Sequence, residues 1–414
     1  MNLSWNTKKI KELYDYSSGL SKSADQFGFG YPFLSYKDVF HNAYLPETLS
    51  TLVNSTEIEQ EKCSIKRGDV FLTRTSETTD ELGMSSVALV DYPYATYNGF
   101  TKRLRPTTNE IHPEFAAYFY RSPYFRAQII SMASLITRAS LNESNLDRLK
   151  ITYPNKETQI VIGNILQSYD LIINSNVKKI RLLEKMASEL YKEWFVRFRF
   201  PGHETTKFVD GVPEGWEMRK LSEMVEFDPF IRLKKGLEYR SVPMDFLSTD
   251  SMLIDTSRCD YTTTTGGAHF QNGDTLLARI TPCLENGKTG FVNTLDDGET
   301  AVGSTEFIVM RSKLLSPHLV YFIARSEYFR KTAINSMNGA DGRQRAKISK
   351  LQSLSYPLPT RDIIDEFSEI VEPFFEEIKN LNIQNHNLTK QRDLLLPRLM
   401  SGKLSVEPLL GQTA

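Results

Sequence analysis

The chain has 414 residues, of which 40% are hydrophobic and 24% charged, with 50 Lys and Arg against 51 Asp and Glu and a net charge of −1. This composition excludes a disordered or collagen-like polymer and a uniformly basic nucleic-acid coat protein, although it leaves room for local basic patches. The length predicts two to three domains at about 150 residues each. Because the sequence has neither an apolar run of about 18 residues nor an N-terminal signal, we expect a cytoplasmic protein without a membrane span.

The first 154 residues are predicted to form a mixed α/β domain. Runs of β-branched and aromatic residues that follow turn residues predict its strands. Pro113 is typical of a helix start, and the helix is expected to end near Arg121-Ser-Pro-Tyr-Phe-Arg126. We expect the aromatic residues of this motif in the core and its arginines in solvent. The predicted strands are Asp69–Thr73 and Ser86–Val90 here, and Thr275–Ala278 and Glu306–Met310 in the second half of the chain.

A long helix is predicted next, from about Thr158 to Phe195. Its apolar residues repeat every seven positions, which is typical of a coiled coil. At 1.5 Å per residue the helix would be about 57 Å long, so we interpret it as a spacer. Asn176 lies in the apolar seam, where a polar residue fixes register and partner at a cost in stability. The seam includes Ile173, Ile180, Leu183 and Leu190.

The second half of the chain repeats the first. Arg325-Ser-Glu-Tyr-Phe-Arg330 matches the motif at Arg121 in five of six residues at an offset of 204 (325 − 121), and other matches follow in the same order. They indicate an internal duplication. The predicted segments are residues 1–154 and 213–357 for two α/β domains, 155–200 and 358–404 for two helical regions, 201–212 for a linker and 405–414 for a tail.

The second helical region carries the same heptad pattern. Asn385 lies in its seam, at a layer that is not equivalent to that of Asn176 in the duplicated register. Seven acidic residues lie between Arg361 and Lys379, a face that would repel phosphate. We expect Pro373, which has no counterpart in the first helix, to start a new helix or to kink this one. Seam residues in this region include Ile378, Leu381, Leu388 and Leu395.

Motifs of the common catalytic classes are absent. Gly287-Lys288-Thr289 is not a phosphate-binding loop, because Pro282 stands where such a loop needs a glycine. We find no dinucleotide or S-adenosylmethionine signature and no nucleophile constellation. The three cysteines and six histidines follow no disulfide or metal spacing. We therefore predict no catalytic residue, metal site or cofactor on this chain, and interpret it as a binding protein.

Two similar domains held apart by helices would form a bivalent reader, and double-stranded DNA suits it because sites along one face recur about every 34 to 36 Å. Reading loops are predicted at Ser134–Asn142 and Asn338–Lys350. Their side chains can donate to guanine, adenine and phosphate, although a solvated loop with incidental charge is the other interpretation. The candidate DNA contacts are Arg138, Asn142, Arg343, Gln344, Arg345, Lys347 and Lys350 in the loops, Arg74, Arg279, Asn286 and Lys288 near the predicted strands, and the basic cluster Lys102, Arg103 and Arg105.

The duplicated plan resembles one family, the DNA specificity subunits of Type I restriction-modification systems. The duplication covers essentially the whole chain, and it is most specific in combination with the C-terminal sequence. The sequences that carry the resemblance are Gly68-Asp-Val and Gly273-Asp-Thr, Pro154 and Pro357 at the domain ends, Glu157-Thr-Gln-Ile at the first helix, Pro-Glu-Gly-Trp216, and Arg392-Asp-Leu-Leu-Leu-Pro-Arg-Leu-Met-Ser-Gly-Lys-Leu404.

The resemblance implies two target recognition domains that each read one half of a bipartite, asymmetric DNA site through the major groove. It also implies that the two helices pack antiparallel, give the chain pseudo-twofold symmetry and set the gap between the half-sites. Two modification subunits, which supply S-adenosylmethionine and methylate adenine, would dock on the helices. Restriction subunits, which supply ATP- and Mg-dependent translocation and cleavage, would join them. The second helix departs from the family's plan at two positions: Asp362 stands where the first helix has Gln159, and Pro373 has no counterpart. Both departures affect the shape expected for the second helix.

Two other functions fit parts of the sequence. One is a self-contained DNA methyltransferase or nuclease with divergent motifs, which would act on DNA without other subunits. The other is a coiled-coil scaffold that holds proteins and does not read DNA. Its complex would bind DNA without salt dependence or not at all, since phosphate contacts release counterions and weaken as salt rises.

Overall fold

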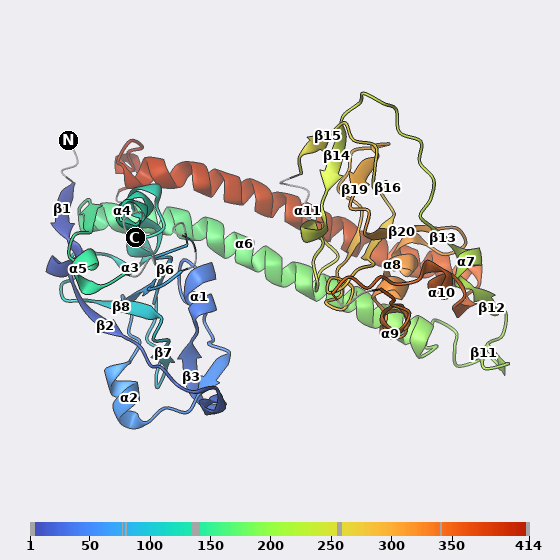
Figure 1. The fold of residues 1–414 in the computed structure, drawn as a ribbon, viewed down its shortest axis with the longest axis horizontal. Helices are drawn as coiled ribbons and strands as arrows, with labels where there is room; N and C mark the ends of the chain where they lie inside the picture. Colours follow the sequence, from blue (N-terminus) through green and yellow to red (C-terminus); the bar gives the residue numbers. More distant parts are fainter. Residues whose placement is uncertain are drawn as a thin grey trace. The chain divides into compact units, whose positions relative to one another are not determined.

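The structure is a computed structural model in which residues 5–76, 78, 81–133, 141–254, 259–339 and 342–410 are described. The chain divides into two compact units: unit 1 consists of Met1–Ile173 with Asn387–Ala414, and unit 2 of Asn174–His386. Each unit combines an α/β part with a stretch of each of two long helices, α6 (Lys156–Tyr191) and α11 (Arg361–Met400) (Figure 1). The fold class predicted from the sequence, mixed α/β units with long helices, is confirmed.

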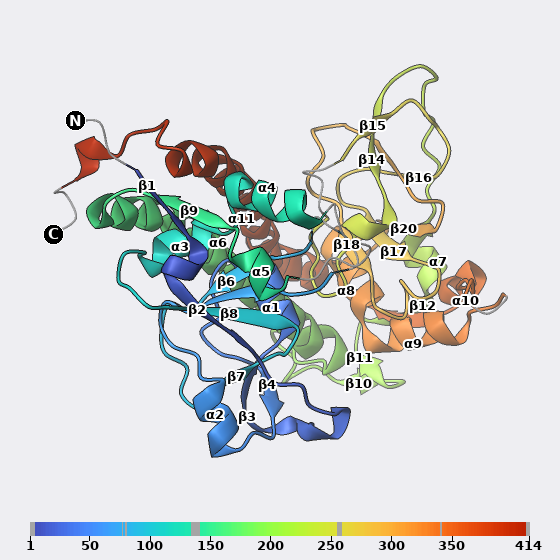
Figure 2. The ribbon, with the colours of Figure 1, turned by 60° about the vertical axis from the view of Figure 1, so that its left-hand side comes forward.

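Unit 1 is built on two sheets and one strand pair. A four-stranded sheet has the order β2-β8-β5-β6, a three-stranded sheet has the order β4-β3-β7, and β1 pairs with β9 at the start of α6 (Figures 1 and 2). The strands are β1 (Asn6–Lys9), β2 (Tyr14–Ser18), β3 (Phe27–Leu34), β4 (Thr51–Val53), β5 (Val70–Thr73), β6 (Ser85–Val87), β7 (Thr96–Tyr97), β8 (Thr101–Pro106) and β9 (Lys150–Tyr153). The helices are α1 (Tyr36–His41), α2 (Glu57–Lys62), α3 (Pro113–Phe119), α4 (Pro123–Ala133) and α5 (Glu143–Leu146), with short turns η1 (Ile10–Glu12), η2 (Ala24–Gln26) and η6 (Glu407–Leu409).

Unit 2 repeats this arrangement. Its four-stranded sheet β13-β20-β17-β18 corresponds to the first sheet of unit 1, β12 pairs with β21 as β1 does with β9, and a second sheet has the order β15-β14-β19-β16. The strands are β10 (Phe208–Val209), β11 (Val212–Pro213), β12 (Glu217–Lys220), β13 (Val225–Phe227), β14 (Tyr239–Val242), β15 (Tyr261–Thr262), β16 (Ala268–Phe270), β17 (Thr275–Ala278), β18 (Thr289–Phe291), β19 (Ala301–Gly303), β20 (Phe307–Ser312) and β21 (Ser355–Leu358). The helices are α7 (Leu221–Met224), α8 (Pro317–Arg325), α9 (Glu327–Asn335) and α10 (Ile348–Gln352), with the π-helical turn η3 (Lys192–Val196) and η4 (Met244–Phe246).

Local sequence explains where these elements begin. Proline stands in the first turn of α3 and of α8. Proline is tolerated there because the first N–H groups of a helix have no acceptor within the helix, so a residue without an N–H loses no hydrogen bond. The Ser35 hydroxyl caps α1 by accepting from the Asp38 N–H, and Thr56 caps α2 in the same way. The central strands β5 and β17 are buried at every position and consist of apolar residues and threonine. Of the predicted strands, Ser86–Val90 is too long, because β6 ends at Val87.

An identical buried ion pair supports the main sheet of each unit. In unit 1, Arg105 donates from Nε to Asp69 Oδ1 at 2.8 Å and from Nη2 to Oδ2 at 2.6 Å. In unit 2, Arg311 donates to Asp274 at the same two distances. Each aspartate comes directly before its central strand, and each arginine lies on the neighbouring strand, β8 or β20. The duplication seen in the sequence therefore extends to side-chain geometry.

The repeated Arg-Ser-x-Tyr-Phe-Arg motif corrects one expectation. Its phenylalanines are buried as predicted, but Tyr124 and Tyr328 are exposed, and the first arginine of each copy is not left to solvent. Arg121 donates to four backbone carbonyl oxygens, and Arg325 donates to two. Burial lowers the pKa of Arg121 to about 10. The arginines are retained because they tie loops to the helix, which a five-donor guanidinium can do.

The two long helices pack against each other within each unit. In unit 1, Ile162 and Leu166 of α6 share a core with Leu399 and Met400 of α11. In unit 2, the residues of α6 from Ile180 onward share a core with residues of α11 from Ile364 to Leu381. Early residues of α6 thus meet late residues of α11 and the reverse, so the helices run antiparallel. Of the predicted seam, Ile180, Ile378 and Leu381 are buried, while Ile173, Leu183, Leu190, Leu388 and Leu395 are half-buried.

Asn176 and Asn385 meet in this helix pair. Asn176 is buried, and its side-chain amide donates to Asn385 Oδ1 at 2.9 Å and to Gln384 Oε1 at 2.8 Å. The positions are not equivalent in the duplicated register, yet the antiparallel arrangement brings them into one layer. A buried polar pair of this kind disfavours other registers, because sliding the helices would leave the amides without partners.

Pro373 neither starts nor ends a helix. The expectation of a new helix there is wrong, since α11 runs without interruption from Arg361 to Met400. A proline costs a helix one backbone hydrogen bond, and the buried residues Val371, Phe375 and Ile378 around it hold this stretch of α11 in the core of unit 2. Within the described ranges, no helix is both long and apolar enough to cross a membrane.

Candidate nucleic-acid interface

Arg74 and Arg279 stand at equivalent places in the two units. Each directly follows the central strand of its sheet, β5 or β17. The backbone N–H of Arg74 donates to the Phe100 carbonyl at 2.8 Å, and that of Arg279 donates to the Glu306 carbonyl at 2.9 Å. Both side chains are half-buried, and in each the Nε is buried without a hydrogen-bond partner in the described structure. A buried donor of this kind is costly unless water or a ligand supplies an acceptor, and the same holds for the Nε atoms of Arg103 and Arg330.

The predicted reading loops are attached to these two arginines. The Leu141 N–H donates to the Arg74 carbonyl at 2.9 Å, and the Ala346 N–H donates to the Arg279 carbonyl at 2.8 Å. In unit 2 the loop continues alongside the same segment, because the N–H of Thr281 donates to the Gln344 carbonyl at 3.0 Å. Two regions that lie far apart in the sequence are thereby brought to the same edge of the sheet.

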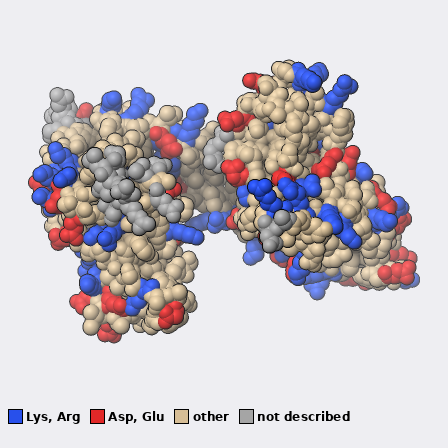
Figure 3. All heavy atoms as spheres, viewed as in Figure 1, with Lys and Arg blue, Asp and Glu red and all other residues tan. Residues whose placement is uncertain are grey.

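In unit 2 the loop presents several cations, and one of them pairs with Glu306, which directly precedes β20. Arg345 binds Glu306 with two nitrogens, Nε at 2.9 Å from Oε2 and Nη2 at 2.6 Å from Oε1. The Arg345 guanidinium lowers the pKa of Glu306, burial opposes this shift, and the charge of Arg279 adds to it. Arg343 is exposed, and its side chain makes no hydrogen bond within the described residues. Lys347 and Lys350 are also exposed. Figure 3 shows basic side chains gathered on this view of unit 2.

The loop of unit 1 is only partly described. Arg138 lies outside the described residues. Asn142 is at its end and caps α5, since its Oδ1 accepts from the Asn145 N–H at 2.9 Å. This local hydrogen bond explains why an asparagine stands there, so Asn142 has a structural role whether or not it contacts DNA.

The basic cluster predicted at residues 102–105 is turned inward. Lys102 and Arg103 are buried; Lys102 binds Glu143 at 3.2 Å, and Arg103 donates to the Ser64 carbonyl at 2.6 Å. Arg105 belongs to the ion pair with Asp69 described above. These three residues lie on β8, and each is engaged by a partner within unit 1, so we do not retain them as phosphate contacts.

Asn286 and Lys288 lie in the turn that follows Arg279. Asn286 is exposed. Lys288 is half-buried and donates from Nζ to the Met244 carbonyl at 3.0 Å, which fixes the turn to the loop after β14. The structure thus brings Arg279 and Arg345 to the same carboxylate, Glu306, while Lys288 is engaged within the unit. Glu306, which organises this site, is not singled out by the sequence beyond its place at the start of a predicted strand.

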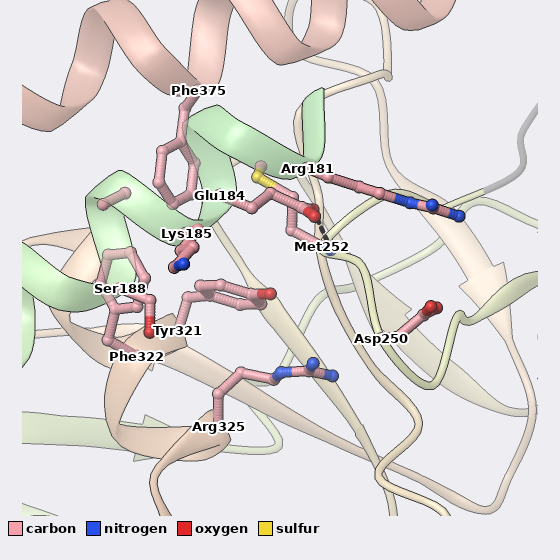
Figure 4. Close-up of a pocket in the computed structure, with 11 residues that line it drawn as sticks. Arg181, Glu184, Lys185, Ser188, Asp250, Met252, Tyr321, Phe322, Arg325 and Phe375 are labelled. Atoms are coloured by element: carbon pink, nitrogen blue, oxygen red, sulfur yellow. Dashed lines mark hydrogen bonds between the residues drawn. The ribbon is translucent and has the colours of Figure 1, made fainter. Parts of the chain in front are cut away.

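A pocket of about 330 Å³ lies where α6 meets the α/β part of unit 2 (Figure 4). At its edge, Glu184 of α6 accepts from the Ser251 hydroxyl and from the Met252 N–H, both at 2.7 Å. Burial raises the pKa of Glu184, and these hydrogen bonds oppose the shift. Apolar walls come from Tyr321 and Phe375. Glu184 therefore fastens the α/β part of unit 2 to the helix.

The helices also carry apolar side chains that face solvent. Unit 1 exposes three such residues on its helical stretches, and unit 2 exposes four. They lie outside the seam that joins α6 to α11. In unit 1 they are Leu171, Ile172 and Leu394, and in unit 2 they are Leu182, Met186, Ile370 and Ile383.

Comparison with known proteins gives consistent matches. Residues 2–185 match the model of the Type I restriction modification DNA specificity domain. The chain is 26% identical to the Type I restriction enzyme MjaIX specificity subunit of Methanocaldococcus jannaschii, over 98% of this chain and 94% of that protein. It is 24% identical to the HindI specificity subunit of Haemophilus influenzae, over 96% and 99%. Its fold is similar to that of the Type-I restriction-modification system S subunit from M. genitalium, with a TM-score of 0.59, 14% identity and 96% coverage of both chains.

Proposed function

We propose that the chain is a DNA specificity subunit of a Type I restriction-modification system and that each of its two units reads one half of a bipartite DNA site. The observation that carries this proposal is the repeated placement of Arg74 and Arg279, each with a buried donor left open at the same edge of a duplicated sheet. The two units share this arginine but differ in their other loops, so each unit presents its own side chains to the bases. Such a pair of units is suited to an asymmetric site.

The helices provide the second part of the proposed function. Antiparallel packing and the Asn176–Asn385 contact fix one register of α6 against α11, and a fixed register would give a fixed gap between the half-sites. The exposed apolar residues of α6 and α11 are suited to bind partner subunits, because apolar side chains of this size gain free energy when an interface covers them. We assign this surface to two modification subunits.

Chemistry would reside on the partners. In this proposal the modification subunits bind S-adenosylmethionine and methylate adenine, the restriction subunits use ATP and Mg for translocation and cleavage, and this chain contributes recognition without catalysis. We call the sheet edge that carries Arg74 or Arg279 and the adjoining predicted loop the reading edge. Its charged side chains suit phosphate and base contacts, since a phosphate or purine acceptor satisfies guanidinium donors without any reaction.

The experiment that tests the proposal is to express the chain with its genomic neighbours and to map methylated adenines across the host DNA by single-molecule sequencing. We expect a two-part motif that disappears when the chain is deleted and returns when it is restored. Methylation that persists unchanged after deletion, in a system that remains active, would refute the reading function and favour the scaffold. Methylation by the purified chain alone would instead reveal an enzyme.

A further inference from the structure

We propose that an exposed phenylalanine works together with the duplicated arginine in each unit, and that the two side chains form a pair that contacts adjacent bases of the half-site. The pair is Phe230 with Arg279 in unit 2 and Phe100 with Arg74 in unit 1. This inference rests on the DNA-reading function proposed above, and it adds two aromatic residues that charge and sequence motifs do not single out.

Phe230 is 88% exposed, which is unusual for so large an apolar side chain. It lies near the start of the loop that joins β13 to β14, and the backbone on both sides of it is anchored. On one side, Asp228 exchanges two hydrogen bonds with Val309, at 2.7 and 2.9 Å. On the other side, the Ile231 carbonyl contacts His269 Nδ1 at 3.0 Å. The ring is therefore held out by a fixed backbone rather than exposed by a loose loop.

Phe230 and Arg279 line the same pocket of about 420 Å³. The pocket thus joins an apolar ring to a guanidinium whose Nε has no acceptor within the described residues. The loop beyond Phe230 carries the exposed cations Arg232, Lys234 and Lys235, which suit the phosphates that flank a contacted base. This combination of a ring, an unsatisfied donor and nearby cations matches a nucleic-acid strand better than an apolar protein partner.

Unit 1 joins an exposed phenylalanine to Arg74 through a backbone hydrogen bond. Phe100 is 61% exposed and precedes β8. Its N–H donates to Asn98 Oδ1 at 2.7 Å, and its carbonyl accepts from the Arg74 N–H at 2.8 Å, so this phenylalanine is also anchored on both sides. In the duplication Phe100 takes the place of Glu306, because their carbonyls accept from the equivalent arginine N–H groups, and Thr305 beside Glu306 is a wall of the unit 2 pocket. An arginine is thus shared by both units, while the phenylalanine arrives from a different loop in each.

The chemistry of the pair follows from its groups. Arg279 can donate to the O6 and N7 acceptors of guanine or to a phosphate, and an aromatic ring can pack on the thymine methyl or on a base face. Loss of an aromatic contact with a base lowers affinity roughly 5- to 150-fold. Because phenylalanine is uncharged, its loss should leave the dependence of binding on salt unchanged.

The test compares assembled complexes that contain the wild-type chain, Phe230→Ala, Arg279→Gln or the control Phe208→Ala. Phe208 is also an exposed phenylalanine of unit 2, but it lies on β10, away from the sheet that carries Arg279. Affinity is measured by fluorescence anisotropy at two salt concentrations on duplexes in which each position of the mapped motif is replaced in turn. Phe100→Ala provides the same measurement for unit 1, and thermal melting verifies that each variant is folded.

We expect Phe230→Ala and Arg279→Gln to lose discrimination at neighbouring positions of one half-site, and Phe100→Ala to lose it in the other half-site, while Phe208→Ala behaves as wild type. Discrimination within twofold of wild type at every position in Phe230→Ala would overturn the inference. An equal loss at both half-sites in that variant would overturn it as well. If the wild-type complex itself shows no sequence preference, the reading function fails first, so the two failures are distinguishable.

Discussion

Replacing one aspartate of a duplicated ion pair by asparagine should destabilise one unit and spare the other. Asp274 accepts three hydrogen bonds in unit 2, two from Arg311 and one from the Gln271 N–H at 2.9 Å. Asp69 accepts the equivalent three in unit 1, the last from the Lys66 N–H at 2.8 Å. In Asp274→Asn, the amide oxygen can take the Oδ2 position and keep two of these hydrogen bonds, but the amide nitrogen then faces the Arg311 Nε donor, and the guanidinium loses its counter-charge.

The size of the effect can be worked from these contacts. One of the three hydrogen bonds is lost and the other two no longer involve a carboxylate, and hydrogen bonds to charged groups contribute about 1.5 to 3 kcal/mol each. The aspartate side chains are almost fully buried, whereas the arginine side chains are 24% and 26% exposed and can regain some hydration. We therefore expect a loss of about 3 kcal/mol in the unfolding free energy of the altered unit. For units of about 200 residues this corresponds to roughly 6 to 12 °C in Tm.

Calorimetry on the full chain measures the prediction with each unit as the control for the other. Asp69→Asn should lower the transition of unit 1, Asp274→Asn should lower that of unit 2, and the double variant should show both shifts, because sites without shared partners act additively. Changes below about 0.5 kcal/mol in both single variants would refute the structural role given to these pairs.

Four further predictions concern charge, pH and register. Arg343→Gln should reduce the slope of log affinity against log salt by about 0.9 if Arg343 contacts a phosphate, and an unchanged slope with relaxed specificity would place it on a base. Burial lowers the pKa of His318 to about 4 against an ordinary 6.5, even though Glu372 lies 3.2 Å away. As the pH falls, the unfolded chain therefore takes up the proton before the folded chain does. The unfolding free energy of unit 2 should fall between pH 6.5 and 4 by at most about 1.4 kcal/mol per pH unit. His318→Gln should abolish this part of the pH dependence in urea titrations. The double variant Asn176→Leu, Asn385→Leu should raise the stability of unit 2 by about 1 kcal/mol in the same assay and relax helix register, whereas a loss of stability would contradict our account of the pair. Four residues inserted near Asn176 should change the gap in the methylated motif or abolish complex assembly, because they shift the heptad register; an unaltered motif would mean that α6 does not set the gap.

Much of the fold could be predicted from the sequence because the duplication supplies internal evidence. Gly68–Arg74 and Gly273–Arg279 indicate two central strands with the same surroundings, and heptad spacing indicates α6 and α11. The family resemblance is confirmed by the comparisons. Pro373 misleads, because local propensity predicts a break, whereas tertiary packing of the residues around it keeps the helix intact. The contact between Asn176 and Asn385 requires knowledge of the antiparallel direction, which heptads alone do not give.

The reading edge was harder to predict from the sequence. Basic residue type alone does not distinguish a phosphate contact from a structural arginine, as Arg105 shows by pairing with Asp69 while Arg74 keeps an open donor. Alternation along β8 directs successive side chains to opposite faces of the sheet, and which face each one takes depends on register rather than on composition. The exposure of Phe230 could not be predicted from the sequence, because whether a phenylalanine is exposed or buried depends on the backbone conformation of the residues on either side.

The division of the chain has a consequence for its synthesis. Unit 2 is one continuous stretch, Asn174–His386, whereas unit 1 needs Asn387–Ala414 to complete its core around Ile162 and Leu166. During translation, the apolar residues of α6 in unit 1 therefore remain partly uncovered until the ribosome has made all of unit 2 and the end of α11. A nascent chain stalled inside unit 2 would present these residues to chaperones or proteases, so only a chain translated through Leu399 and Met400 would leave the ribosome with both units closed.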